Sequence, residues 1–216
     1  MRIEIDLLRN YPKTVRDRPP ATFFQSTIAR KFGKDFFDGH RVYGYGGYHY
    51  DPKYWTPVVP DIMSHFNLKP GMSVLDVGCA KGFLMHDLHE AGLEVAGIDI
   101  SQYAVDNAME DVKPFIEVGN AVELPFANES FDVVLSINTV HNLERDDCSK
   151  ALREIRRVCK HGSFITVDAW RTEEERQRMM DWNLTAKTIM SCDEWREFFK
   201  DCYAGDYYWF ICSTAQ

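Results

Sequence analysis

Apolar positions recur at helical spacing directly after Pro57. Val58, Ile62 and Phe66 fall on one face of the helix that this spacing predicts, and a proline suits its first turn. Beyond a turn, strand-like apolar runs alternate with helix-like segments. The expected strands cover 73–77, 94–98, 115–118, 131–137, 164–167 and 207–211, and the expected helices cover 83–90, 102–112, 149–159, 172–182 and 193–202. The segment 183–191 has no clear pattern.

Strands that alternate with helices imply right-handed crossovers and a parallel sheet. We therefore predict the α/β class, with a doubly wound, mostly parallel, Rossmann-like sheet of six or seven strands and helices on both faces. Residues 57–170 would form the ligand-binding core, and 171–216 would add cap helices and the last strand of the same domain. Residues 1–56 include a short helix over 24–32 and the aromatic, glycine-rich run 43–50, and we interpret them as an arm or lid.

Charge is distributed unevenly along the 216 residues. With 25 Lys and Arg against 33 Asp and Glu, the formal net charge is −8, which argues against a general affinity for nucleic acid or an anionic membrane. Residues 1–41 carry nine basic and five acidic side chains, a local balance of +4. We therefore expect attraction between a mildly basic arm and an acidic core to help hold the arm in place.

The cysteines and the apolar runs bear on the location of the protein. The six cysteines form no Cys-x-x-Cys pair and show no zinc-ligand spacing with histidine, so we expect free thiols in a reducing compartment and no metal. The first residues lack the apolar core of a secretory signal, and the apolar run 133–135 is too short to cross a bilayer. We expect a cytoplasmic protein.

The loop between the first expected strand and the next helix carries the most information. It reads Asp76-Val-Gly-Cys-Ala-Lys-Gly82, and glycines at such a junction let the backbone turn sharply and let a ligand approach. A nicotinamide-type loop reads Gly-x-Gly-x-x-Gly, whereas Ala80 and Phe83 stand here at the second and third glycine positions. A carboxylate at Asp76 would repel a pyrophosphate and attract a cationic ligand.

Asp99 closes the second expected strand. Together with the glycine loop it resembles the first two motifs of the class I S-adenosylmethionine-dependent methyltransferases, type 11-like, in which an acidic residue precedes spaced glycines and another ends the second strand. Further matching segments follow in the family's order at 119–126, 130–136 and 152–158. The resemblance covers roughly 57–170 and implies S-adenosyl-L-methionine as cofactor and S-adenosyl-L-homocysteine as product.

The resemblance also implies a set of cofactor-binding positions: Asp76, Gly78, Cys79, Ala80, Gly82, Asp99, Ile100, Asn120, Ala121 and Asn138. Asp76 would face the sulfonium and amino end, Asp99 the ribose hydroxyls and Ile100 the adenine. Asn120 and Ala121 would lie near the adenine amino group. The alternatives are a strand-end carboxylate for Asp76, a helix cap for Asp99 and a turn residue for Asn120.

The acceptor side offers three candidate catalytic residues. His141 follows the fourth expected strand and has a side-chain pKa range suited to a general base, and Asp168 near the end of the fifth strand is a second candidate. Tyr48 belongs to the aromatic run of the arm, whose rings could close over a sulfonium while a hydroxyl orients the acceptor. The alternatives are structural roles for His141 and Asp168 and simple packing of the arm onto the surface.

These observations predict a methyltransferase that moves a methyl group from S-adenosylmethionine to an O or N atom of a small acceptor, such as a sugar or another metabolite. The alternatives are a nicotinamide-dependent oxidoreductase and a non-catalytic, methyltransferase-like partner subunit. No Asn-Pro-Pro-Tyr sequence follows the fourth expected strand, which argues against the enzymes that methylate amino groups of DNA bases. We expect no nucleic-acid or membrane partner and leave a homodimer open.

Overall fold

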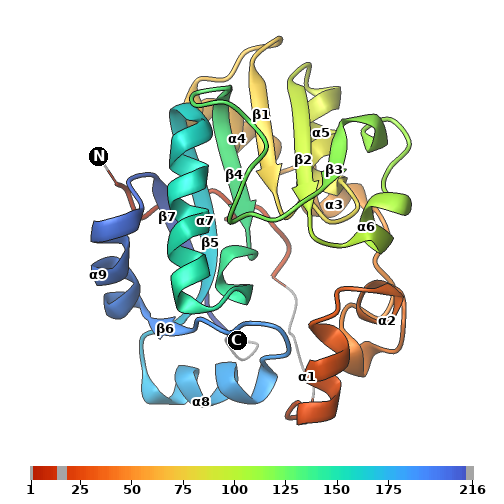
Figure 1. Cartoon of the computed structure of the whole chain (residues 1–216), viewed down its shortest axis with the longest axis vertical. Coiled ribbons are helices and arrows are strands. Elements are labelled where there is room, and N and C mark those ends of the chain that lie inside the picture. Colours follow the sequence, from red (N-terminus) through yellow and green to blue (C-terminus); the bar gives the residue numbers. More distant parts are fainter. Residues whose placement is uncertain (1, 14–18, 213–216) are drawn as a thin grey trace.

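The computed structural model describes residues 2–13 and 19–212, which build a seven-stranded sheet with helices on both faces (Figure 1). The strand order is β3-β2-β1-β4-β5-β6, and β7 also pairs with β5. All the strand pairs in this part of the chain are parallel. The strands are β1 (Ser73–Val77), β2 (Glu94–Asp99), β3 (Ile116–Val118), β4 (Phe131–Ile137), β5 (Cys159–Trp170), β6 (Met190–Ser191) and β7 (Asp206–Phe210).

The helices fall into three groups along the chain. The arm contains α1 (Phe23–Ala29), α2 (Lys34–Phe37) and α3 (Pro52–Trp55). The core contains α4 (Val59–Phe66), α5 (Phe83–Glu90), α6 (Gln102–Asp106) and α7 (Arg145–Val158), and the cap contains α8 (Glu173–Trp182) and α9 (Cys192–Cys202). Single 3₁₀ turns lie at η1 (Arg41–Tyr43), η2 (Lys113–Phe115) and η3 (Val140–Asn142).

The predicted fold class is confirmed, and several element boundaries are corrected, of which two change most. The helix expected over 102–112 ends at Asp106, because the Met109 N–H donates to the Lys81 carbonyl of the glycine loop and Pro114 disfavours helix at the residue before it. The strand expected over 164–167 runs over Cys159–Trp170, because β4 pairs with its first part and β6 and β7 pair with later parts.

Two apolar clusters, one on each face of the sheet, hold the layers together. On one face, α7 and α9 pack through Leu152, Ile155 and Trp195, which are fully buried. On the other, α4 and α5 pack through Ile62 and Leu88. The apolar positions of α7 recur every three or four residues, so that one stripe of this otherwise charged helix faces the sheet.

The first residues of the arm belong to the sheet and its covering layer. The Ile5 N–H donates to the Tyr207 carbonyl and the Tyr207 N–H donates to the Ile3 carbonyl, so this segment lies along β7. Leu7 is buried in the cluster with α4 and α5. The interpretation of 1–56 as a lid therefore does not apply to these residues, which extend the core instead.

Helices α1 and α2 of the arm and α8 of the cap lie at the edge of the sheet where the parallel strands end (Figure 1). The Ala21 N–H donates to the Asp181 carbonyl at 3.0 Å, and Ser101 Oγ donates to the Phe32 carbonyl. Arg30 reaches the Ala186 carbonyl at 3.4 Å. The arm is thus bonded both to the core and to the cap around the carboxyl ends of the strands, where ligands bind in open α/β sheets.

The two apolar clusters predict a graded response to truncation. Leu152→Ala removes a fully buried side chain from α7, and we expect it to lower the free energy of unfolding by about 2–5 kcal/mol. Phe24→Ala is the matched control, because Phe24 is 65% exposed, and its effect should stay within about 0.5 kcal/mol. Denaturant unfolding measures both, and equal effects would contradict this description of the core.

Candidate cofactor site and its surroundings

The glycine loop turns back onto β2 as soon as β1 ends. The Gly78 and Cys79 N–H groups both donate to the Ile98 carbonyl, at 2.7 and 3.2 Å. Gly78 has a φ of +86°, and a Cβ on it would lie 2.2 Å from Thr139 Oγ1. Only glycine fits there, because any side chain would collide with the segment that follows β4.

Asp99 braces this loop from the end of β2. Its Oδ2 accepts a hydrogen bond from the Ala80 N–H at 2.8 Å, and its Oδ1 accepts one from the Ser101 N–H at 2.8 Å. Ala80 stands in the left-handed region at a φ of +51°, which costs a residue with a Cβ about 1–2 kcal/mol. The helix cap of α6 is Ser101, whose Oγ accepts from the Ala104 N–H, so the capping alternative for Asp99 does not hold.

Asp76 is buried on β1, and no described residue donates a hydrogen bond to its carboxyl group. Burial, reinforced by the charge of Asp99, raises the pKa of Asp76 to about 7. Burial also raises the pKa of Asp99, against the opposing hydrogen bonds from Ser101 and Ala80. The two carboxyl groups thus share a buried region that would favour a cation with hydrogen-bond donors.

The other predicted cofactor-binding residues differ in exposure and in their contacts. Ile100 is 57% exposed directly beyond Asp99, and Cys79 is buried. Asn120 uses its Oδ1 to accept the Val122 N–H at 3.2 Å, which is the turn contact that the sequence left as an alternative. Ala121 packs against the cluster of α7 and α9.

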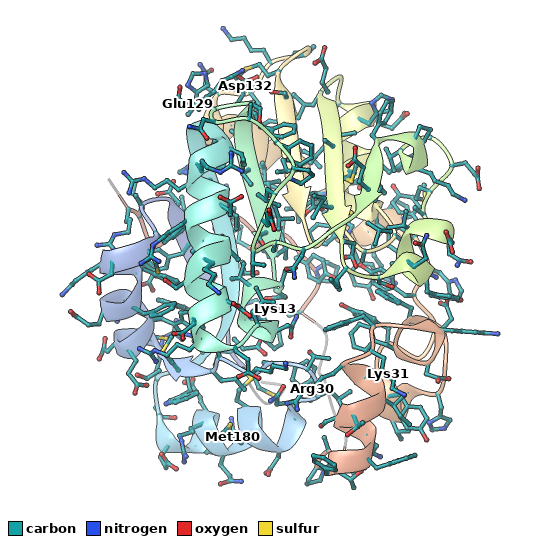
Figure 2. The ribbon with its side chains drawn as sticks, in the orientation of Figure 1. Lys13, Arg30, Lys31, Glu129, Asp132 and Met180 are labelled. Atoms are coloured by element: carbon teal, nitrogen blue, oxygen red, sulfur yellow. The ribbon has the colours of Figure 1, made fainter. Side chains whose placement is uncertain are left out.

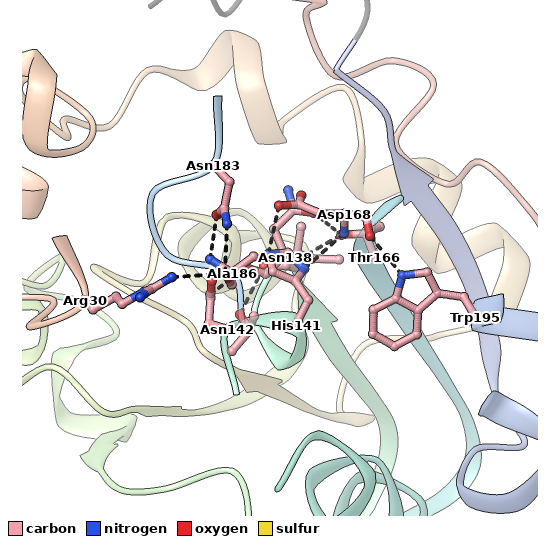
Figure 3. Close-up of polar contacts among 11 residues, drawn as sticks. Arg30, Asn138, His141, Asn142, Thr166, Asp168, Asn183, Ala186 and Trp195 are labelled. Atoms are coloured by element: carbon pink, nitrogen blue, oxygen red, sulfur yellow. Dashed lines mark hydrogen bonds and ion pairs between the residues drawn. The ribbon is translucent and has the colours of Figure 1, made fainter. Parts of the chain in front are cut away.

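Asn138 directly follows β4 and is tied to β5. Its N–H donates to Thr166 Oγ1 at 2.9 Å, and Thr166 Oγ1 donates to Asn138 Oδ1 at 2.9 Å (Figure 3). Asn138 has a φ of +53°, a conformation that asparagine tolerates better than most residues. Asn142 Nδ2 donates to the Asn138 carbonyl at 3.3 Å. This network fixes the turn beyond β4.

His141 and Asp168, the two candidate bases, are brought together and buried. The Asp168 N–H donates to His141 Nδ1 at 3.1 Å, and His141 Nε2 lies 3.4 Å from Asp168 Oδ2 (Figure 3). Burial lowers the pKa of His141, although the charge of Asp168 opposes this. Because Nδ1 accepts, Nε2 carries the proton of the neutral ring, and this geometry favours the structural alternative over proton abstraction.

His141 also joins the cap to the core through its backbone. Its carbonyl accepts from the Lys187 and Thr188 N–H groups, both at 3.0 Å. Trp195 Nε1 donates to the Asp168 carbonyl at 2.9 Å (Figure 3). The segment 183–191, which showed no pattern in the sequence, is thus fixed by these contacts and by the two-residue strand β6.

Tyr48, the third catalytic candidate, lies against the start of α5. Its ring stacks on Phe83 at 4.7 Å between centroids and contacts Tyr45 at 4.3 Å. Burial is the main cause that raises the pKa of its hydroxyl, and the charges of Asp76 and Asp99 add to it. The arm therefore places this phenol within the electrostatic reach of the two buried carboxyl groups.

Sequence reasoning missed the residues that hold Tyr48. Lys81 Nζ, inside the glycine loop, donates to Asp38 Oδ2 at 2.6 Å and to the Tyr48 carbonyl at 2.9 Å. Tyr103 Oη donates to the same Asp38 oxygen at 2.7 Å. A lysine between Ala80 and Gly82 was the available signal, but its partner lies 43 residues away.

Neither a metal site nor a membrane span was found where the structure is described. Residues 2–13 and 19–212 contain no group of three or more His, Cys, Asp or Glu side chains placed to hold a metal ion. Within the same residues, no helix is both long enough and apolar enough to cross a bilayer.

Residues 75–167 match the family described as methyltransferase domain. These residues form a methyltransferase domain. It is 35% identical over 135 residues to 2-methyl-6-phytyl-1,4-hydroquinone methyltransferase of Synechocystis sp., covering 59% of this chain and 41% of that protein. It is 30% identical to the tRNA (carboxymethyluridine(34)-5-O)-methyltransferase of Arabidopsis thaliana, covering 72% of this chain and 38% of that one.

A solved structure shows the same methyltransferase fold. The complex between the Trm112 methyltransferase activator and a methyltransferase of Haloferax volcanii contains a chain that matches with a TM-score of 0.57 at 22% identity, covering 86% of this chain and 76% of that one. The chain spans about 40% of the length of the two curated relatives above. One of these is named for a hydroquinone and the other for a tRNA, so their names do not support the expected exclusion of nucleic acid.

The raised pKa of Asp76 predicts a pH-dependent stability. The Asp76 carboxyl group stays protonated up to a pKa of about 7 in the folded chain, above its usual value of 3.8. Its protonation therefore stabilises the folded chain at low pH, and this stabilisation is lost as the pH rises through 7. Asp76→Asn removes the loss, so its stability relative to the natural chain should rise by roughly 2 kcal/mol from pH 5.5 to pH 8.5.

Denaturant unfolding of the ligand-free protein at the two pH values tests this. Asp132→Asn is the matched control, because the hydrogen bond from the Ser73 N–H lowers the pKa of Asp132, and that variant should be less stable at both pH values. A difference between Asp76→Asn and the natural chain that stays constant from pH 5.5 to 8.5 would contradict the raised pKa.

The geometry of His141 predicts its tautomer. Nitrogen NMR shifts at pH 7 should show one ring that is neutral and protonated at Nε2, and this ring should not titrate near the usual pKa of about 6.5, because burial opposes its charge. The signal is assigned by its absence from His141→Gln. A ring that becomes charged at or above pH 6.5 would restore His141 as a candidate base.

Proposed function

We propose that this chain uses S-adenosylmethionine to methylate an O or N atom of a small-molecule acceptor. The observation that carries the proposal is the pair of buried carboxyl groups, Asp76 and Asp99, at the glycine loop. Asp76 accepts no hydrogen bond from the described residues, so a ligand with a cationic amino group and a sulfonium would supply what this carboxylate lacks.

The residues present fit this cofactor. The left-handed backbone at Gly78 and Gly82 keeps side chains away from the loop, which lets a ligand come close. Asp99 uses one lone pair of each oxygen for the Ala80 and Ser101 N–H groups, and its remaining lone pairs can accept from ribose hydroxyls. Exposed Ile100 offers an apolar surface beside them for the adenine.

The bound sulfonium supplies an activated methyl group for an in-line displacement. The chain itself contributes alignment and exclusion of water, which are the main contributions available in such a reaction. Tyr48 and its aromatic neighbours would cover the site from the arm, while the His141–Asp168 pair would fix the loop beyond β4. We assign His141 a positioning role, because its Nδ1 lone pair is already used.

The enclosure of the site favours a small acceptor, such as a sugar or another metabolite with a hydroxyl or amino group. The arm is bonded to the cap at Ala21 and to the core at Ser101, and in this position it would restrict the entry of a large substrate. The formal net charge of −8 further disfavours a polyanion. Transfer to a supplied tRNA but to no small hydroxyl or amino compound would overturn this part of the proposal.

The two rival functions are distinguished by ligand binding and turnover. A nicotinamide enzyme should bind NAD and not S-adenosylhomocysteine. The match to the methyltransferase domain and the alanine at position 80 both argue against this function. A non-catalytic partner subunit would not need two buried carboxyl groups, Asp76 and Asp99, beside the glycine loop. Calorimetric titration with S-adenosylhomocysteine and NAD distinguishes the proposed methyltransferase from a nicotinamide enzyme.

The variant Asp99→Ala tests how much the Asp99 carboxylate contributes to the affinity for S-adenosylhomocysteine. The variant removes the acceptor for ribose hydroxyls and the brace on Ala80, so the Kd for S-adenosylhomocysteine should rise at least about tenfold, or about 1.4 kcal/mol. Asp201→Ala is the control, because Asp201 is exposed on α9, far along the chain from the loop. Isothermal titration calorimetry measures both, and an unchanged Kd in Asp99→Ala would remove Asp99 from the site.

A further inference from the structure

A buried ion pair joins the arm to the cofactor loop. Lys81 lies between the two turns of the loop, and its side chain is only 7% exposed. Its Nζ is 2.6 Å from Asp38 Oδ2, and Asp38 follows α2 of the arm with a side chain 19% exposed. Both charges are largely removed from water, so each depends on the other and on its hydrogen bonds.

Asp38 gathers contacts from three parts of the chain. Its Oδ2 accepts from Lys81 Nζ in the loop and from Tyr103 Oη on α6, and its Oδ1 accepts from the Tyr48 N–H of the arm at 3.0 Å. Although burial acts in the opposite direction, the hydrogen bonds led by that from Lys81 lower the pKa of Asp38 to about 2. The carboxylate therefore stays charged and fully engaged across the neutral range.

The backbone of Tyr48 is held on both sides by this pair. Its N–H donates to Asp38, and its carbonyl accepts from Lys81 at 2.9 Å. Its ring then stacks on Phe83, the first residue of α5 after the loop. The ion pair thus fixes both where the tyrosine enters and which side of the loop its ring covers.

The polarity of this contact is the reverse of what the charge balance suggested. The arm is basic as a whole, and Figure 2 shows Arg30 and Lys31 on it. Yet the buried pair takes its acid, Asp38, from the arm and its cation, Lys81, from the acidic core. This buried contact is therefore not an attraction of a basic arm for an acidic core, whereas the ion pair of Arg9 with Asp61 is one.

We propose that Lys81 is a positioning residue that couples closure of the arm to the cofactor site, by holding Tyr48 as a wall of that site. The proposal rests on the proposed function, because the site is that of S-adenosylmethionine. If the arm moved away, the Lys81 ammonium would lose both Asp38 and the Tyr48 carbonyl. Lys81 belongs to the glycine loop, which must be ordered for the ligand to bind. Ligand binding and arm closure therefore favour one another.

The test compares the full-length chain with Lys81→Met, which keeps the length of the side chain and removes its charge. We expect the Kd for S-adenosylhomocysteine to rise at least about tenfold by calorimetry. In the free protein, amide hydrogen exchange should become faster over residues 36–48, while β1 and β4 keep their protection. Lys150→Met on α7 is the control, because that lysine forms an exposed ion pair with Asp147, and neither quantity should change.

Two further variants cover the case in which Lys81→Met fails to fold. Tyr103→Phe removes one hydroxyl from Asp38, and Asp38→Asn removes its charge; each should accelerate exchange over 36–48 and weaken S-adenosylhomocysteine binding. The double variant Lys81→Met/Asp38→Asn should lose little more affinity than the weaker-binding single variant, because both act through one contact.

The outcomes separate the two proposals. If the natural chain binds S-adenosylhomocysteine and the loop and arm variants bind it equally well, the coupling is overturned while the proposed function stands. If the natural chain does not bind it, the proposed function fails. Exchange then decides whether Lys81 holds the arm, and unchanged exchange over 36–48 in these variants overturns this inference in either case.

Discussion

The parallel pairing of β1 with β2 is the constraint on which the site depends. Because Val77 pairs with Ile98, the two strands end side by side and their carboxyl groups, Asp76 and Asp99, are forced into one buried region. The backbone must then turn away at once, and the Gly78 N–H does so by returning to the Ile98 carbonyl. The loop, the raised pKa of Asp76 and the room for a cationic ligand all follow from this pairing.

The methyltransferase fold uses this constraint at a cost in stability. Two buried acids beside each other oppose folding as the pH rises, and Ala80 adds backbone strain through its left-handed conformation. Asp99 offsets part of that strain by accepting the Ala80 N–H. A ligand with the charge and donors of S-adenosylmethionine would relieve the remaining repulsion, so the destabilised site and its proposed function have the same cause.

The arm and the cap show how distant segments complete such a site. Lys81, Asp38 and Tyr48 bring the loop and the arm together, whereas His141 and Thr188 tie the loop beyond β4 to the segment before β6. Both connections use side chains or carbonyl groups that the hydrophobic pattern of the sequence does not indicate. A few specific polar contacts therefore bring the arm and the cap to the carboxyl edge of the sheet.

The sequence by itself determined the α/β class, most strand positions and the loop with its two acids, because periodicity and glycine placement are local properties of the chain. The roles of the candidate side chains were decided only by the tertiary structure. Asn120 satisfies its own turn, His141 accepts a backbone N–H, and the early end of α6 follows from the bond between Met109 and Lys81. Each depends on a partner brought close by folding, and sequence spacing carries no information about such a partner.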